Sequence, residues 1–197
     1  MHSYSIDSNE RPTIYLILAA ISILATFTLN LIFGKLNLTI PWFVETPSVM
    51  SIYGLLCLCF TKVFWKLNLL HKIGLVNTPV LIGKWNGEVQ SSFDQHSSKQ
   101  EVVIEIKQDW TNIQICLRGK NSNSKSQNAS ITVQDGLRLT YDYLNEPSPD
   151  ANQNMNIHRG TAILELSSDG SFEGEYYSGR GRQSFGRLKM EKFTNNL

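Results

Sequence analysis

The chain has 197 residues, of which 42% are hydrophobic and 18% charged, and its formal net charge is +1. From Leu75 onward 13 Lys and Arg stand against 14 Asp and Glu, which disfavours a broad surface for duplex nucleic acid. The three cysteines show neither a disulfide framework nor the spacing of metal ligands.

Two apolar segments near the N-terminus predict a transmembrane hairpin. Residues 13–33 carry no charge, and a helix needs roughly 20 residues to cross a ~30 Å hydrocarbon core. Residues 48–65 are just long enough, and Lys62 can extend its ammonium group to the lipid headgroups. The alternative for either segment is a buried helix of a soluble domain. We assign the hairpin and its juxtamembrane exit segment to residues 1–76.

Flanking charge predicts the orientation of this hairpin. The only basic residue between the two helices is Lys35, whereas Lys62, Lys66 and Lys72 follow the second helix and Arg11 precedes the first. Because basic residues accumulate on the cytoplasmic side, both termini are expected in the cytoplasm.

A polar stripe on the first helix predicts helix association. Ser22, Thr26 and Asn30 recur every four residues and share one face. Polar side chains in lipid seek partners on neighbouring helices. The partner is either the second helix of the same hairpin or another protomer.

From residue 77 to residue 197 the apolar pattern has the period of two that is typical of strands. The runs cover residues 82–89, 101–108, 112–118, 126–133, 137–143, 158–166 and 172–176, with a last run after Gly186. We predict an all-β soluble domain, an eight-stranded antiparallel up-and-down β-barrel that closes its own edges. A β-sandwich is the alternative.

The start of the first strand, Gly83-Lys84-Trp85, resembles the Gly-x-Trp start of lipocalins. In that family a basic residue of the closing strand covers the tryptophan, a role that the resemblance gives to Arg187. It implies a lipocalin-like calyx.

Catalytic motifs are absent from the sequence. It contains no Gly-x-Ser-x-Gly elbow, phosphate loop, His-Glu-x-x-His or paired-Cys motif. Of the four histidines only His158 lies on an inward strand face, and a lone interior histidine is more often a core residue than a base. We predict neither enzymatic activity nor a metal site; an enzyme that uses His158 with a nearby carboxylate is the alternative.

Aromatic and basic residues gather late in the chain. Aromatic faces stack on nucleobases with about 1–3 kcal/mol per base, and arginine forks match phosphate oxygens. Strict alternation turns Tyr177 outward if Tyr176 points inward. The alternative is that these tyrosines are ordinary core and the Arg-Gly loop is a solvated turn. The predicted ligand-binding residues are Tyr141, Tyr143, His158, Tyr176, Tyr177, Arg180 and Arg182.

The order of these parts resembles the two-transmembrane, β-strand-rich effectors of bacterial CBASS antiphage systems, a family of CD-NTase-associated proteins. The likeness rests on the hairpin followed by Leu81-Ile82-Gly83-Lys84-Trp85-Asn86-Gly87, the Ser-rich residues 121–126, Leu139-Thr140-Tyr141-Asp142-Tyr143, His158-Arg159-Gly160-Thr161-Ala162 and Phe172-Glu173-Gly174-Glu175-Tyr176-Tyr177.

The resemblance implies a multi-pass protein of the bacterial inner membrane with a cytoplasmic β-barrel. The barrel would bind a cyclic oligonucleotide, with a cyclic dinucleotide expected, made by a partner CD-NTase during phage infection. The activated protein would form a homo-oligomer and disrupt the lipids of the inner membrane, which causes abortive infection. The residues alone leave a second function open, a membrane-anchored lipocalin-like binder of an apolar small molecule.

Overall fold

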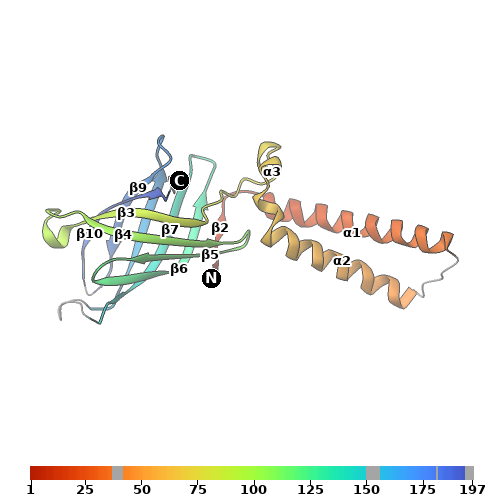
Figure 1. Ribbon diagram of the computed structural model, residues 1–197, viewed down its shortest axis with the longest axis horizontal. Coiled ribbons are helices and arrows are strands. Elements are labelled where there is room, and N and C mark those ends of the chain that lie inside the picture. The colour runs from red at the N-terminus through yellow and green to blue at the C-terminus, as the bar shows by residue number, and fades with distance from the viewer. Residues whose placement is uncertain (37–41, 150–155, 181, 194–197) are drawn as a thin grey trace. The chain divides into compact units, whose positions relative to one another are not determined.

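The computed structural model describes residues 1–36, 42–149, 156–180 and 182–193. The chain divides into two units, Ser8–Asn77 and a second unit in which Met1–Asp7 joins Thr78–Leu197. Figure 1 shows helices in the first unit and strands in the second. Residues 1–7, which the sequence analysis grouped with the hairpin, are therefore part of the strand-rich unit.

The helical unit contains α1 (Glu10–Lys35) and α2 (Trp42–Lys62), followed by the short helices η1 (Phe64–Lys66) and α3 (Asn68–Lys72). Within the described residues α1 has the length and apolar composition of a membrane span, whereas the apolar part of α2, Val49–Lys62, is shorter. The second helix was predicted to end at residue 65. It ends at Lys62 because the chain tightens there into the 3-10 turn η1.

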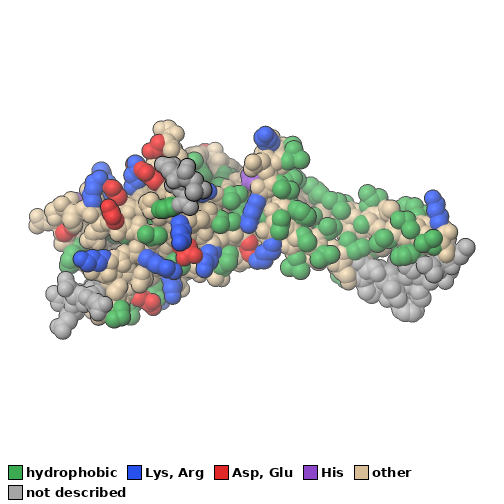
Figure 2. All heavy atoms as spheres, viewed as in Figure 1, with side chains coloured by type: hydrophobic (Ala, Val, Ile, Leu, Met, Phe, Trp, Pro, Cys, Tyr) green, Lys and Arg blue, Asp and Glu red, His purple; other side chains and the backbone are tan. Residues whose placement is uncertain are grey.

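Large apolar side chains cover the surface of α1. Leu16, Ile23, Leu24 and Phe27 are 59–73% exposed, and Figure 2 shows hydrophobic side chains along both long helices. Soluble monomers rarely expose a continuous apolar surface of this extent. Such a surface is typical of helices that face lipid.

The predicted association stripe of α1 is largely buried within the chain. Ser22 and Thr26 are buried, and Asn30 is partly buried. The Ser22 hydroxyl donates to the Ala19 carbonyl at 2.7 Å, and the Thr26 hydroxyl donates to the Ser22 carbonyl at 2.9 Å. Both hydroxyls therefore have acceptors within α1, and the role of the stripe in helix association stays a prediction.

The strand-rich unit is a closed antiparallel barrel. In the described part of the chain its eight strands are β3 (Gly83–Ser91), β4 (Gln100–Gln108), β5 (Asn112–Arg118), β6 (Ser122–Thr132), β7 (Arg138–Pro147), β8 (His158–Leu166), β9 (Phe172–Ser178) and β10 (Phe185–Lys192). Each strand pairs with the next along the chain, and β10 returns to pair with β3. The predicted eight-stranded up-and-down barrel is confirmed, and the sandwich alternative is wrong because one ladder runs around all eight strands.

The barrel core follows from alternation along each strand. Ile104, Ile113, Leu139 and Leu164 point inward and are fully buried. The end at which β3 begins is filled by large side chains, including Trp110. That end is therefore closed, and any interior space lies toward the opposite end.

The cover of Trp85 differs from the lipocalin expectation. Arg187 is exposed, because its neighbour Leu188 occupies the inward position of β10. Lys192 lies directly opposite Trp85 in the β10–β3 ladder, and its ammonium nitrogen is 5.8 Å from the indole centroid. A basic residue of the last strand thus covers the tryptophan, but register assigns the role to Lys192.

The ladder between β5 and β6 is short. These strands pair only over Cys116–Arg118 and Asn123–Lys125 in the described residues, and the β6 register shifts between Ser126 and Asn128. Beyond the shift the two strands separate. Backbone groups of both strands would stay unpaired there if nothing filled the gap.

The N-terminal strap, residues 1–7, fills this gap. Its strand β1 (His2–Ser3) pairs with β5, and its strand β2 (Ser5–Ile6) runs parallel to β6. Between them Tyr4 is buried, and its hydroxyl donates to the Trp110 carbonyl at 3.0 Å. The strap thus completes the barrel wall at the closed end.

Close packing of β8 and β9 requires a glycine at position 174. A Cβ atom at Gly174 would overlap the Ile163 carbonyl, whereas one at Gly119 would make ordinary contact at 3.5 Å. We expect Gly174→Ala to lower the free energy of unfolding by about 1–3 kcal/mol or more, because the ladder must shift. Urea unfolding of the full chain in detergent measures this loss. Gly119→Ala is the matched control, and an equal loss in both variants would contradict the packing argument.

Candidate ligand-binding site

The open end of the barrel holds a cavity of about 110 Å³. Five of the seven predicted ligand-binding residues line it: Tyr141, Tyr143, His158, Tyr176 and Arg182. Pockets that enclose a whole small ligand measure about 300–1,000 Å³. A ligand larger than one nucleobase would therefore also have to use the mouth.

Tyr141 and Tyr143 form the aromatic wall of the cavity. They lie on the inward face of β7, with ring centroids 6.3 Å apart and ring planes inclined by 54°. Burial raises the pKa of both phenols, so both keep their protons at neutral pH. Gly160 on β8 makes room for Tyr143, since a Cβ atom at Gly160 would overlap the phenol.

The two tyrosines of β9 point in opposite directions. Tyr176 is half-buried and lines the cavity, whereas Tyr177 is 48% exposed on the outer face. This is the alternation that a regular strand imposes. The structure thus brings Tyr176 to the cavity and does not bring Tyr177 there.

His158 stands at the start of β8 with its imidazole buried. Its Nδ1 lies 2.9 Å from the Asn156 carbonyl oxygen, which can only accept, so we assign the ring proton to Nδ1. Burial lowers the pKa of His158, and the positive charge of Arg182 lowers it further. The imidazole is therefore neutral at neutral pH, and Nε2 is an acceptor.

Arg182 is carried to the mouth by the turn between β9 and β10. The Ser178 backbone N–H donates to the Ser184 carbonyl at 2.7 Å, and the two hydroxyls lie 2.8 Å apart, which closes the base of the turn. The Arg182 guanidinium carbon lies 4.8 Å from the Phe93 ring centroid, a cation–π contact with η2 (Ser92–Asp94). This contact joins the β9–β10 turn to η2 at the mouth of the cavity.

The rest of the Arg-Gly turn does not reach the cavity. Arg180 is exposed and is absent from the described lining. The Gly179 backbone N–H donates to the Arg159 carbonyl at 2.8 Å. This amide is therefore not available to bind a phosphate. Gly181 lies outside the described residues.

The lining residues that the sequence analysis did not name include Asp94, Lys120 and Asn145. Lys120, in the β5–β6 turn, adds a second cation to the mouth. Asp94 Oδ1 and Asn145 Oδ1 are buried acceptors without a hydrogen-bond partner among the described residues. Asn145 could have been found, because it continues the inward series of Tyr141 and Tyr143. Neither Lys120 nor Asp94 stands in a motif that marks it.

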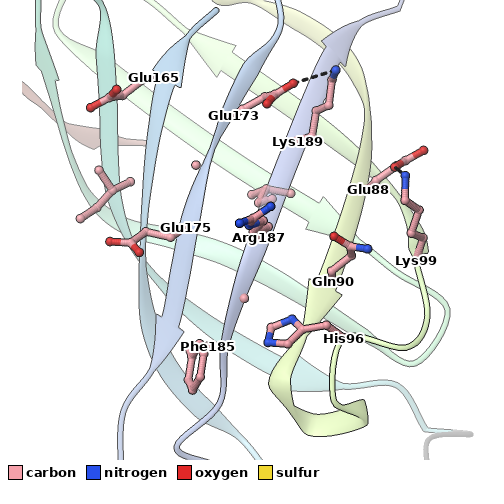
Figure 3. A pocket seen from close by; sticks show the side chains of 14 residues that line it. Glu88, Gln90, His96, Lys99, Glu165, Glu173, Glu175, Phe185, Arg187 and Lys189 are labelled. Carbon is pink, nitrogen blue, oxygen red and sulfur yellow. Dashed lines mark hydrogen bonds and ion pairs between the residues drawn. The ribbon is translucent and has the colours of Figure 1, made fainter.

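A second hollow, of about 970 Å³, lies on the outer face of the barrel over β3, β8, β9 and β10 (Figure 3). Two ion pairs lie within its lining: Lys189 contacts Glu173 at 2.7 Å, and Lys99 contacts Glu88 at 2.9 Å. Its described lining holds four glutamates and three cationic side chains.

The two hollows differ in their balance of charge. The mouth of the inner cavity presents Arg182 and Lys120 against Asp94, whereas the outer hollow has an excess of carboxylates. This balance of charge favours a phosphate-bearing ligand at the inner cavity over the outer hollow. No group of three metal-ligating side chains occurs among the described residues. The inner cavity is therefore the candidate site.

Known proteins resemble this chain over most of its length. Residues 76–192 match the family model described as Cap15, cyclic dinucleotide receptor domain. A protein of Yersinia aleksiciae named CD-NTase-associated protein 15 is 31% identical over 153 residues, which cover 75% of this chain and 71% of the relative. A protein of the same name from Staphylococcus schleiferi is 30% identical over 101 residues, covering 51% and 54%. The expected resemblance to CBASS effectors is thus confirmed, and the chain belongs to the Cap15 family, whose cyclic dinucleotide receptor domain is its β-barrel.

Proposed function

We propose that the protein is an antiphage CBASS effector that binds a cyclic dinucleotide made by a CD-NTase, assembles into homo-oligomers and disrupts the inner membrane. The observation that carries this proposal is the tyrosine-lined cavity with two cations at its mouth, inside the domain that matches the receptor family. Aromatic faces suit nucleobases, and cations suit phosphates.

The cavity size suggests how such a ligand is held. A space of about 110 Å³ takes only part of a molecule with two bases, two sugars and two phosphates. One base enters the cavity against the wall formed by Tyr141 and Tyr143, while the phosphates stay at the mouth beside Arg182 and Lys120. The ligand then leaves unchanged, which agrees with the absence of catalytic motifs from the sequence.

Two membrane crossings by the helical unit form part of the proposal. The N-terminal strap pairs with β5 and β6, so the chain before α1 and the chain after residue 78 belong to one barrel. A chain that starts and ends on the same side of a membrane crosses it an even number of times. If α1 spans, the chain must return before residue 78, and the apolar surface of α2 supports this second crossing. The lysines after α2 favour the cytoplasmic side.

Homo-oligomers would form when the helices of several protomers are brought close together. The exposed apolar faces of α1 and α2 can pack against those of other protomers, and contacts between helices in lipid are individually weak. Barrels that associate on binding ligand would concentrate these helices and favour oligomers.

Reconstitution of the full chain tests the proposed function. In dye-loaded vesicles of bacterial lipid, a cyclic dinucleotide that binds by calorimetry should release dye and produce ladders with an amine-reactive crosslinker. Chromatography should recover the ligand intact. The proposal fails if no cyclic dinucleotide binds, or if binding produces neither leakage nor ladders.

A further inference from the structure

We infer that Asn145 and His158 read the N–H edge of a guanine, so the protein prefers cyclic dinucleotides that contain guanine. This inference rests on the proposed function and names the class of ligand for the same cavity. It follows from two neighbouring acceptors on the cavity wall.

The first acceptor is the side-chain carbonyl of Asn145. Asn145 is 8% exposed and lines the cavity, and its Nδ2 donates to the Ser122 hydroxyl at 3.1 Å. We assign the amide so that Nδ2 donates to this hydroxyl, which makes Oδ1 its other end. Oδ1 is buried and has no partner within the described residues. A buried acceptor without a partner is costly, which points to a ligand that supplies a donor.

The second acceptor is Nε2 of His158. The Nδ1 proton donates to the Asn156 carbonyl, and the neutral ring keeps a lone pair on Nε2. His158 is 7% exposed and lines the same cavity. It lies directly opposite Asn145 in the β7–β8 ladder. Side chains of directly opposed residues leave the sheet on one face with Cβ atoms about 4.5–5.5 Å apart, so the two acceptors are neighbours.

Two neighbouring acceptors select among nucleobases by matching donors. Guanine presents two adjacent donors, N1–H and the 2-amino group, on one edge. Adenine has a single amino group flanked by ring nitrogens whose lone pairs would face an acceptor. Uracil has a single N–H between two carbonyl oxygens. Guanine alone among these bases satisfies both acceptors without opposing two lone pairs.

A ligand panel on the wild-type full chain in detergent is the primary test. We expect calorimetry to give cyclic di-GMP at least about 10-fold tighter binding than cyclic di-AMP, because a lost donor leaves a buried acceptor unpaired. The inosine analogue, which keeps N1–H but lacks the 2-amino group, should fall between them. Cyclic di-AMP binding as tightly as cyclic di-GMP would overturn the inference while leaving the proposed function intact. A failure of every cyclic dinucleotide to bind would overturn both.

Substitution of Asn145 tests the residue assignment. Asn145→Ala should reduce the preference for cyclic di-GMP over cyclic di-AMP by about 10-fold through weaker cyclic di-GMP binding. Asn86→Ala, on the exposed face of β3, is the matched control and should keep the wild-type preference. Thermal unfolding of both variants shows whether the barrel is intact. If the Asn145→Ala protein is folded and keeps the wild-type preference for cyclic di-GMP over cyclic di-AMP, Asn145 does not recognise guanine.

Discussion

We expect Tyr4→Ala to lower the free energy of unfolding of the barrel by about 3–5 kcal/mol, as for other large aromatic side chains removed from a core. Tyr4 is 3% exposed, and it belongs to the hydrophobic core of the barrel although it precedes α1 in the chain. Its hydroxyl donates to Trp110 and accepts from Gln108 Nε2 at 3.4 Å. Chemical unfolding of the full chain in detergent, followed by the fluorescence of buried tryptophans, measures the loss.

Two further variants separate packing from strand pairing. Tyr4→Phe keeps the ring and loses only the hydroxyl, so its loss should be about 1 kcal/mol. Deletion of residues 1–7 removes the strap and exposes the edges of β5 and β6, so it should destabilise the barrel at least as much as Tyr4→Ala. A deletion variant with the stability of the wild type would show that the strap is dispensable.

We expect Arg182→Ala to weaken cyclic dinucleotide binding by about 10- to 100-fold, the range for a lost hydrogen bond to a charged group. Arg182 stands at the mouth of the cavity and is held there by its contact with Phe93. Binding should also become less sensitive to salt, because one cation fewer faces the phosphates. Calorimetry at low and high salt measures both changes.

Arg180→Ala is the natural comparison, since Arg180 lies two residues away in the same turn and is exposed. Its substitution should change affinity by less than about threefold, as expected for a charge outside the site. Equal losses in the two variants would mean that the whole turn acts as a diffuse positive surface. That result would contradict the assignment of phosphate contact to Arg182.

Local sequence patterns predict the barrel well. Its strands and tight turns are encoded by alternation of period two and by turn residues such as Asp135-Gly136, both of which are readable in short windows. Tyr141, Tyr143 and Tyr176 follow from the same alternation. The strap could not be predicted, because strands of two residues carry no measurable period and their partners lie far along the chain.

Side chains in turns and at strand ends were the part of the site that was hardest to predict from the sequence. Arg180 and Arg182 are equivalent in sequence, and only the conformation of the turn separates them. Lys192 covers Trp85 because of pairing register, which the Gly-x-Trp pattern does not specify. The importance of Asn145 depends on an unpaired oxygen, which is a property of the folded cavity and not of the residue type.

The strap also sets an order of events during synthesis. It leaves the ribosome before α1 and before the barrel strands, yet His2 must wait for Ile113 and Ser5 for Ser130. At about 5–20 residues per second, several seconds pass between the two, during which α1 and α2 emerge. The last step of barrel folding therefore follows the synthesis of both long helices. If the helices cross the membrane twice, as proposed, a chain with only one helix inserted would hold the strap and the barrel strands on opposite sides, and its seam could not form.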